Sequence, residues 1–120
     1  MNELKLGAVD ARFAQIVWDH APMTTGELIW QCAQELQWKR TTTYTVLRKF
    51  CDNGIFRCEN GRVSVLIGRD ELRGMQSARF VDEVFGGSLP AFIAAFANTK
   101  KLTQEEVQRI REMIDKAGEE

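Results

Sequence analysis

Side chains that can donate hydrogen bonds to a polyanion gather between residues 39 and 62. Hydroxyl, phenol, ammonium and guanidinium groups bind phosphate oxygens and base edges, and the cations also neutralise phosphate charge. Only Asp52 and Glu59 are acidic in this stretch, although the whole chain has a formal net charge of −1. A basic stretch in a balanced chain predicts an anionic partner on one face of the protein. The candidate contact residues are Lys39, Arg40, Thr41, Thr42, Tyr44, Thr45, Arg48, Lys49, Arg57 and Arg62.

The spacing of the apolar residues predicts that most of these candidates share one helix. A helix that begins at Thr41 or Thr42 and ends at Asn53-Gly54 has a single apolar stripe, and the glycine suits a left-handed C-terminal cap. That inward stripe consists of Thr43, Val46, Leu47 and Phe50. The other polar side chains then point outward, with Lys39 and Arg40 at the helix entrance. A polar helix face without carboxylates suits the major groove of DNA, so this helix is the predicted reading element.

The remaining elements of the N-terminal half match a scaffold that holds such a helix. Apolar spacing predicts a first helix from about Val9 to His20 and a second helix that opens with a Thr24-Glu27 capping box. After the third helix, two β-rich runs (Ile55 to Glu59 and Arg62 to Ile67) flank Asn60-Gly61, a strong hairpin signal. Three helices followed by a hairpin is the chain order of a winged helix-turn-helix, whose wing would carry two of the candidate arginines.

Residues 70–120 follow a different pattern, with three apolar helical stripes that break at Gly86-Gly87-Ser88 and before a Thr103-Glu106 capping box. A segment this short is marginal as a separate core, and its phenylalanines would leave a large apolar patch on a monomer. We therefore expect two copies to pair through this segment; a helical cap folded back on the same chain is the alternative. The residues expected at the pairing surface are Leu72, Val81, Phe85, Leu89, Phe92, Ile93, Phe96, Val107, Ile110 and Ile114.

Together these patterns predict a mainly α protein with a small β-hairpin wing. Residues 1–68 are expected to form a winged-helix DNA-binding domain, and residues 69–120 a dimerisation domain of three helices. The expected function is sequence-specific repression of transcription by a homodimer. A dimeric winged-helix module that binds protein without reading DNA sequence is the alternative.

Other classes of site find little support in the sequence. Cys32, Cys51 and Cys58 lack CxxC spacing and are expected as buried apolar residues; with a single histidine, His20, they predict no metal site. Nucleophile–base pairings and glycine-rich phosphate loops are missing, so neither an enzyme nor a cofactor is expected. The apolar runs are too short for a membrane span and the N-terminus lacks a secretory signal, so we expect a cytoplasmic location.

The sequence resembles the penicillinase and methicillin-resistance repressors, a family related to copper-responsive repressors, over nearly its whole length. The threonine-rich segment Thr41 to Lys49, which follows a tryptophan, carries the resemblance most specifically. It continues in Ile16-Val17-Trp18, in the segment Leu28 to Trp38, in Asn60-Gly61-Arg62 and in Phe85 to Phe96.

The resemblance implies a dimer that binds a pseudo-palindromic operator and blocks transcription. It also implies a membrane sensor protease as a partner, which answers β-lactams and leads to cleavage of the repressor in its C-terminal domain. The family's scissile bond is typically Asn-Phe, and the matching pair here, Ala95-Phe96, departs from that pattern. Copper-responsive members carry a C-terminal cysteine cluster that this sequence lacks, so copper sensing is not expected.

Overall fold

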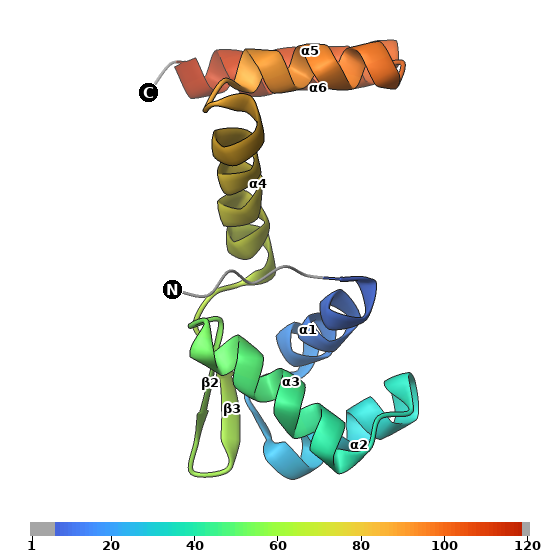
Figure 1. Cartoon of the computed structure of the whole chain (residues 1–120), viewed down its shortest axis with the longest axis vertical. Helices are drawn as coiled ribbons and strands as arrows, with labels where there is room; N and C mark the ends of the chain where they lie inside the picture. The colour runs from blue at the N-terminus through green and yellow to red at the C-terminus, as the bar shows by residue number, and fades with distance from the viewer. Residues whose placement is uncertain (1–6, 119–120) are drawn as a thin grey trace. The chain divides into compact units, whose positions relative to one another are not determined.

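The computed structural model describes residues 7–118 and separates into two compact units, one ending at Gln76 and the other beginning at Ser77. Both are mainly helical, and the first also contains a three-stranded antiparallel sheet, which confirms the predicted fold class (Figure 1). The elements, in chain order, are α1 (Ala8–His20), β1 (Met23–Thr24), α2 (Thr25–Leu36), α3 (Arg40–Asp52), β2 (Phe56–Glu59), β3 (Arg62–Val65), α4 (Arg69–Phe85), α5 (Leu89–Thr99) and α6 (Gln104–Gly118).

Local signals position α2, and they include one of the two hydrogen bonds of the predicted Thr24-Glu27 capping box. The Thr24 hydroxyl accepts a hydrogen bond of 3.0 Å from the backbone N–H of Glu27, so it caps the helix at its N-terminus. At the other end Gln37 adopts a left-handed conformation (φ 54°), and its N–H donates to the carbonyl of Cys32. The cap at Gln37 ends α2 and leads into the short connection to α3, which begins at Arg40.

The wing is the predicted hairpin, extended by a strand that the sequence analysis missed. Asn60 (φ 54°) and Gly61 (φ 73°) form the tight turn between β2 and β3, because both positions need a positive φ. In the sheet order β1-β3-β2, Met23 of β1 lies opposite Val63 of β3. Strand β1 has only two residues and exists through this long-range pairing, so it left no periodic signal in the sequence.

An aromatic core joins the wing to the helices. The ring centroids of Phe13 and Phe50 lie 5.4 Å apart, and those of Phe50 and Phe56 lie 5.2 Å apart. All three rings are buried, as is Val63 on the inner face of β3. Val65, the last residue of β3, lies opposite Phe56 but keeps 37% of its surface exposed.

The second unit is held together by rings rather than by a buried core. Phe92 of α5 contacts Phe80 and Phe85 of α4 at centroid distances of 6.1 and 5.5 Å. The predicted Thr103-Glu106 capping box forms reciprocally at the start of α6, with hydrogen bonds of 3.0 and 3.1 Å. Neither α5 nor α6 contains a fully buried side chain.

No single helix within residues 7–118 is long and apolar enough to cross a membrane; only the bent pair of α4 and α5 reaches that length and hydropathy together.

Candidate nucleic-acid interface

Helix α3 buries one stripe and leaves the opposite face in solvent, as its sequence predicts. Thr43, Leu47 and Phe50 are buried, with 1%, 3% and 0% of their surfaces exposed. Val46, the fourth residue of the stripe, is half-buried against the same core. The inward orientation of this stripe is therefore confirmed, and the polar residues between its members are directed outward.

The outward face carries hydroxyls and cations from the helix entrance onward. The side chains of Lys39, Arg40, Thr41, Thr42, Thr45, Arg48 and Lys49 are exposed, and that of Tyr44 is half-buried. The Arg40 guanidinium carbon lies 5.7 Å from the centre of the Tyr44 ring, which orients the cation at the first turn. The Thr45 hydroxyl donates to the carbonyl of Thr41 at 2.9 Å, and its oxygen can still accept a further hydrogen bond.

The N-terminus of α3 adds backbone donors that have no partner among residues 7–118. Lys39 precedes the helix in an extended conformation, and its side chain makes no capping hydrogen bond. The first backbone donor of the helix to find a partner is Thr43, whose N–H binds the carbonyl of Lys39 at 3.1 Å. The N–H groups of the first turn therefore point along the axis beside two cationic side chains, an arrangement that suits a phosphate.

A buried contact between α2 and α3 fixes the orientation of the reading face. The Thr43 hydroxyl donates to the Lys39 carbonyl at 3.2 Å, and both Thr43 and Cys32 are buried. Burial raises the pKa of Cys32 to about 11. Cys32 is thus a neutral thiol that packs as an apolar residue between the two helices.

Lys49 differs from the other cations of this face because, among the described residues, it is the one with an acidic partner. Its ammonium forms an ion pair with the carboxylate of Asp10 in α1, and 44% of the Lys49 side chain remains exposed. No local sequence pattern predicts this pair, because the two residues are 39 positions apart. Part of the Lys49 charge is therefore neutralised within the protein.

The wing presents both predicted arginines on one face of the hairpin. Arg57 lies opposite Ser64 and Arg62 lies opposite Glu59, so the alternation of strand residues gives these four side chains a common face. Arg57 and Arg62 are exposed. Glu59 is directly across from Arg62, which lowers the positive potential at the tip relative to the base of the wing.

The three cysteines lie in different environments. Cys32 is buried and Cys51 is half-buried, and burial, with smaller contributions from Cys58 and Asp52, raises the pKa of Cys51. Cys58 is exposed on β2, the edge strand of the sheet, although Val63 opposite it is buried, so the expectation of a buried residue is wrong at this position. Among the described residues, no group of three or more His, Cys, Asp or Glu side chains is placed to hold a metal ion.

The residues expected at a pairing surface fall into two groups. Leu72 is buried in the core of the first unit, with 4% of its surface exposed. The other candidates belong to the second unit, where Val81, Phe85, Phe92, Ile93, Val107 and Ile110 are half-buried and Leu89, Phe96 and Ile114 are exposed. Phe80, one of the phenylalanines of the expected apolar patch, and Val84 are also exposed, at 49% and 58%.

Comparison with known proteins finds one matching family and two relatives of low sequence identity. The sequence model of a family described as penicillinase repressor matches residues 6–116. The penicillinase repressor of Bacillus licheniformis is 22% identical over 105 residues, which cover 84% of this chain and 82% of that protein. The methicillin resistance regulatory protein MecI of Staphylococcus aureus (strain Mu50 / ATCC 700699) is 18% identical over 116 residues, which cover 93% and 94%.

Proposed function

This chain belongs to the penicillinase repressor family, whose members are transcriptional repressors and not enzymes, and from that membership we propose that it is a homodimeric repressor that reads a pseudo-palindromic operator. The outward face of α3 is the proposed reading surface, and the hairpin of β2 and β3 is the proposed wing. Such a protein acts where the DNA lies, so its proposed location is the cytoplasm.

The observation that carries this proposal is the separation of the two faces of α3. Its inward face is fixed by Thr43, Leu47 and Phe50, so the outward face cannot rotate away from solvent without loss of the core. That face carries only hydroxyl, phenol and cationic side chains from Lys39 to Lys49. A surface with these donors can enter a major groove without bringing a carboxylate near the phosphates.

Dimerisation is proposed from the apolar surface of the second unit. Leu89, Phe96 and Ile114 are 51%, 44% and 54% exposed, which is a large apolar surface for so short a segment. A second copy related by a two-fold axis would bury it and present two reading helices to half-sites roughly 34 Å apart. The proposed pairing surface comprises the predicted residues from Val81 to Ile114; Leu72, as part of the first core, supports the fold instead.

A sensor protease is the proposed partner for release from DNA. The pair Ala95-Phe96 lies inside α5, where the carbonyl of Ala95 accepts a hydrogen bond from Thr99 at 3.1 Å and that of Phe96 accepts one from the Lys100 N–H at 2.8 Å. A protease that requires an extended substrate must unwind this turn first. Deletion of a sensor gene adjacent to that of the repressor should abolish induction and cleavage; unchanged induction excludes this partner.

A salt-titrated binding assay on fragments of the chain's own promoter tests the main proposal. A repressor should prefer one fragment over random DNA of equal length by about a thousandfold or more, with an affinity that falls as salt rises. Equal affinity for both DNAs would instead favour a winged-helix module that does not read sequence. Sedimentation of the same sample reports whether the bound species is a dimer.

A further inference from the structure

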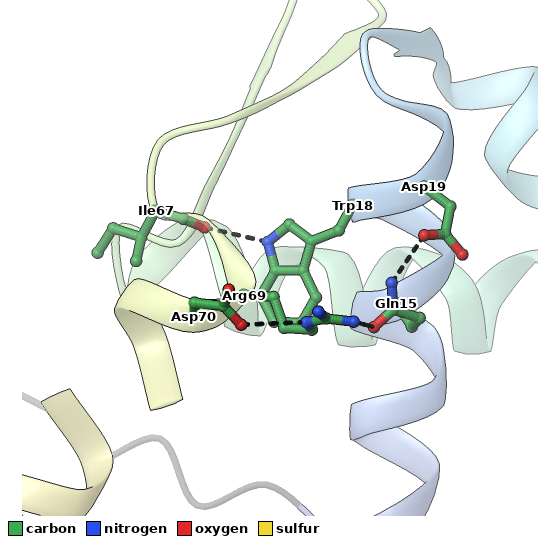
Figure 2. Close-up of polar contacts among 6 residues, drawn as sticks. All are labelled: Gln15, Trp18, Asp19, Ile67, Arg69 and Asp70. Carbon is green, nitrogen blue, oxygen red and sulfur yellow. Dashed lines mark hydrogen bonds and ion pairs between the residues drawn. The ribbon is translucent and has the colours of Figure 1, made fainter. Parts of the chain in front are cut away.

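Residues 66–68, which connect β3 to α4, are hydrogen-bonded to α1. The indole N–H of Trp18 donates to the carbonyl of Ile67 at 3.0 Å, and Figure 2 shows the indole directed from α1 toward that carbonyl. The same indole packs edge-on against Phe56, with ring centroids 5.8 Å apart. The hydrogen bond is partly buried, so water competes with it less than at an open surface.

A second set of contacts holds the first turn of α4. The Arg69 guanidinium donates to the side-chain oxygen of Gln15 and to Asp70, each at 3.4 Å, and the Gln15 amide donates to Asp19 at 2.7 Å (Figure 2). One turn later Leu72 is buried in the same core as the helices of the first unit. The start of α4, up to Gln76, is therefore structurally part of the reading unit.

We propose that Trp18, Ile67, Gln15 and Arg69 form a latch that sets the direction in which α4 leaves the reading unit, and that this latch determines which half-site spacing the protein accepts. The inference rests on the proposed function, since it concerns a dimer on two half-sites. α4 leads from the reading unit to the proposed pairing residues, so its exit direction limits where the two α3 helices can lie. Trp18 and Arg69 are positioning residues and need not touch DNA themselves.

Spacing is a sensitive readout of that direction. One inserted base pair moves the second half-site by about 3.4 Å and rotates it by about 34° around the duplex. A dimer with the latch intact should bind operators of one half-site spacing well. A dimer with a loosened latch should bind several spacings with more equal affinity. A role limited to stability would lower the affinity at all spacings by the same factor and leave the preference intact.

The test compares Trp18→Phe and Arg69→Ala with the parent chain on operators with zero, one, two or five base pairs inserted between half-sites. Phenylalanine keeps an apolar ring at position 18 but removes the N–H donor, and Arg69→Ala changes an exposed side chain that the fold tolerates. The ratio of affinities between the best and the worst spacing should fall about fivefold in each variant, as expected for one lost hydrogen bond. The affinity for a single half-site should stay unchanged.

Matched controls separate the latch from general effects of the substitutions. Trp30→Phe removes a tryptophan that is 61% exposed on α2, and Arg12→Ala removes an arginine that donates to Glu35 rather than to the α4 start. Both controls should keep the parent's spacing preference. The latch proposal is wrong if Trp18→Phe and Arg69→Ala also keep the parent's spacing preference. It is also wrong if the parent reads the half-site sequence but binds all spacings equally well. Loss of sequence preference in the parent itself overturns the proposed function instead.

Discussion

Lys49 of α3 forms an ion pair with Asp10 of α1, and this pair distinguishes Lys49 from its neighbour Arg48. The two cations are adjacent in sequence and both are exposed, yet part of the charge of Lys49 is already balanced. An exposed pair of this kind contributes only about 0 to 1 kcal/mol to stability. Its main consequence is therefore for the charge that the reading face presents to phosphates.

Removing the carboxylate should strengthen DNA binding. Asp10→Asn frees the Lys49 ammonium and removes a negative charge near the duplex, so the affinity for DNA should rise a few-fold at low salt. Fluorescence anisotropy at two salt concentrations measures this effect. Asp19→Asn, a like change on the same helix, is the control and should alter affinity less; a fall in affinity for Asp10→Asn would contradict the assigned face.

Arg48 should matter more than Lys49. Arg48→Ala removes a cation that is directed outward from the stripe, and it should weaken operator binding by about 1 to 3 kcal/mol. Lys49→Ala should cost less, because its ammonium is already paired. Thermal unfolding should show nearly parental stability for both variants. Parental operator affinity in both would place the DNA contact elsewhere.

The core that orients α3 should be sensitive to truncation. Phe50 is fully buried and contacts Phe13 and Phe56, so Phe50→Ala should lower the free energy of unfolding by about 3 to 5 kcal/mol. Thr42→Ala, on the exposed side of the same helix, should change it by no more than about 0.5 kcal/mol. Urea denaturation followed by tryptophan fluorescence compares them, and equal effects would mean that the two faces are wrongly assigned.

The apolar surface of the second unit should control association. Phe96→Asp places a charge where we propose that a second copy packs, so sedimentation velocity should show monomers at concentrations at which the parent is a dimer. Val9→Asp makes the same change at an exposed apolar residue of α1 and should leave the dimer intact. A persistent dimer in the Phe96 variant would move the pairing surface to other residues.

The burial of Cys32 predicts a loss of stability at high pH. Its pKa is about 11 in the folded chain and 9.0 when unperturbed, so the folded state holds the thiol proton more tightly. The resulting stabilisation is fully present below pH 9 and is lost as the pH rises toward 11, by about 2 to 3 kcal/mol in all. The free energy of unfolding, measured by denaturation at several pH values between 9 and 11, should fall more with pH for the parent than for Cys32→Ala. An equal fall in both proteins would contradict the assignment.

Local signals in the sequence predicted much of this structure. The Thr103-Glu106 capping box, the Thr24 half of the Thr24-Glu27 box and the Asn60-Gly61 turn formed, because each depends on residues within three or four positions. The inward stripe of α3 was predictable for the same reason, since helical periodicity reports burial directly. The outward face of the candidate site followed from that stripe by exclusion.

Contacts between distant residues were beyond the reach of such patterns. Strand β1, the pairing of Lys49 with Asp10, and the bond from Trp18 to Ile67 each join residues that are 38 or more positions apart. The apolar residues of α4 keep helical spacing without a break in the sequence. In the structure, however, Leu72 packs in the first unit and the residues after Gln76 belong to the second. Periodicity shows that a helix has an apolar face, but not which core that face joins.

The outward face of α3 as the DNA-reading surface is the central claim, and amide chemical shifts test it most directly. Uniformly ¹⁵N-labelled full chain should be titrated with a duplex that contains the preferred promoter sequence. The account predicts that the largest shift changes fall on residues 39–48 and on the wing between Arg57 and Arg62, with little change around Trp30 of α2. If instead the changes concentrate on α1 and α2 and leave α3 unshifted, the proposed reading surface is wrong.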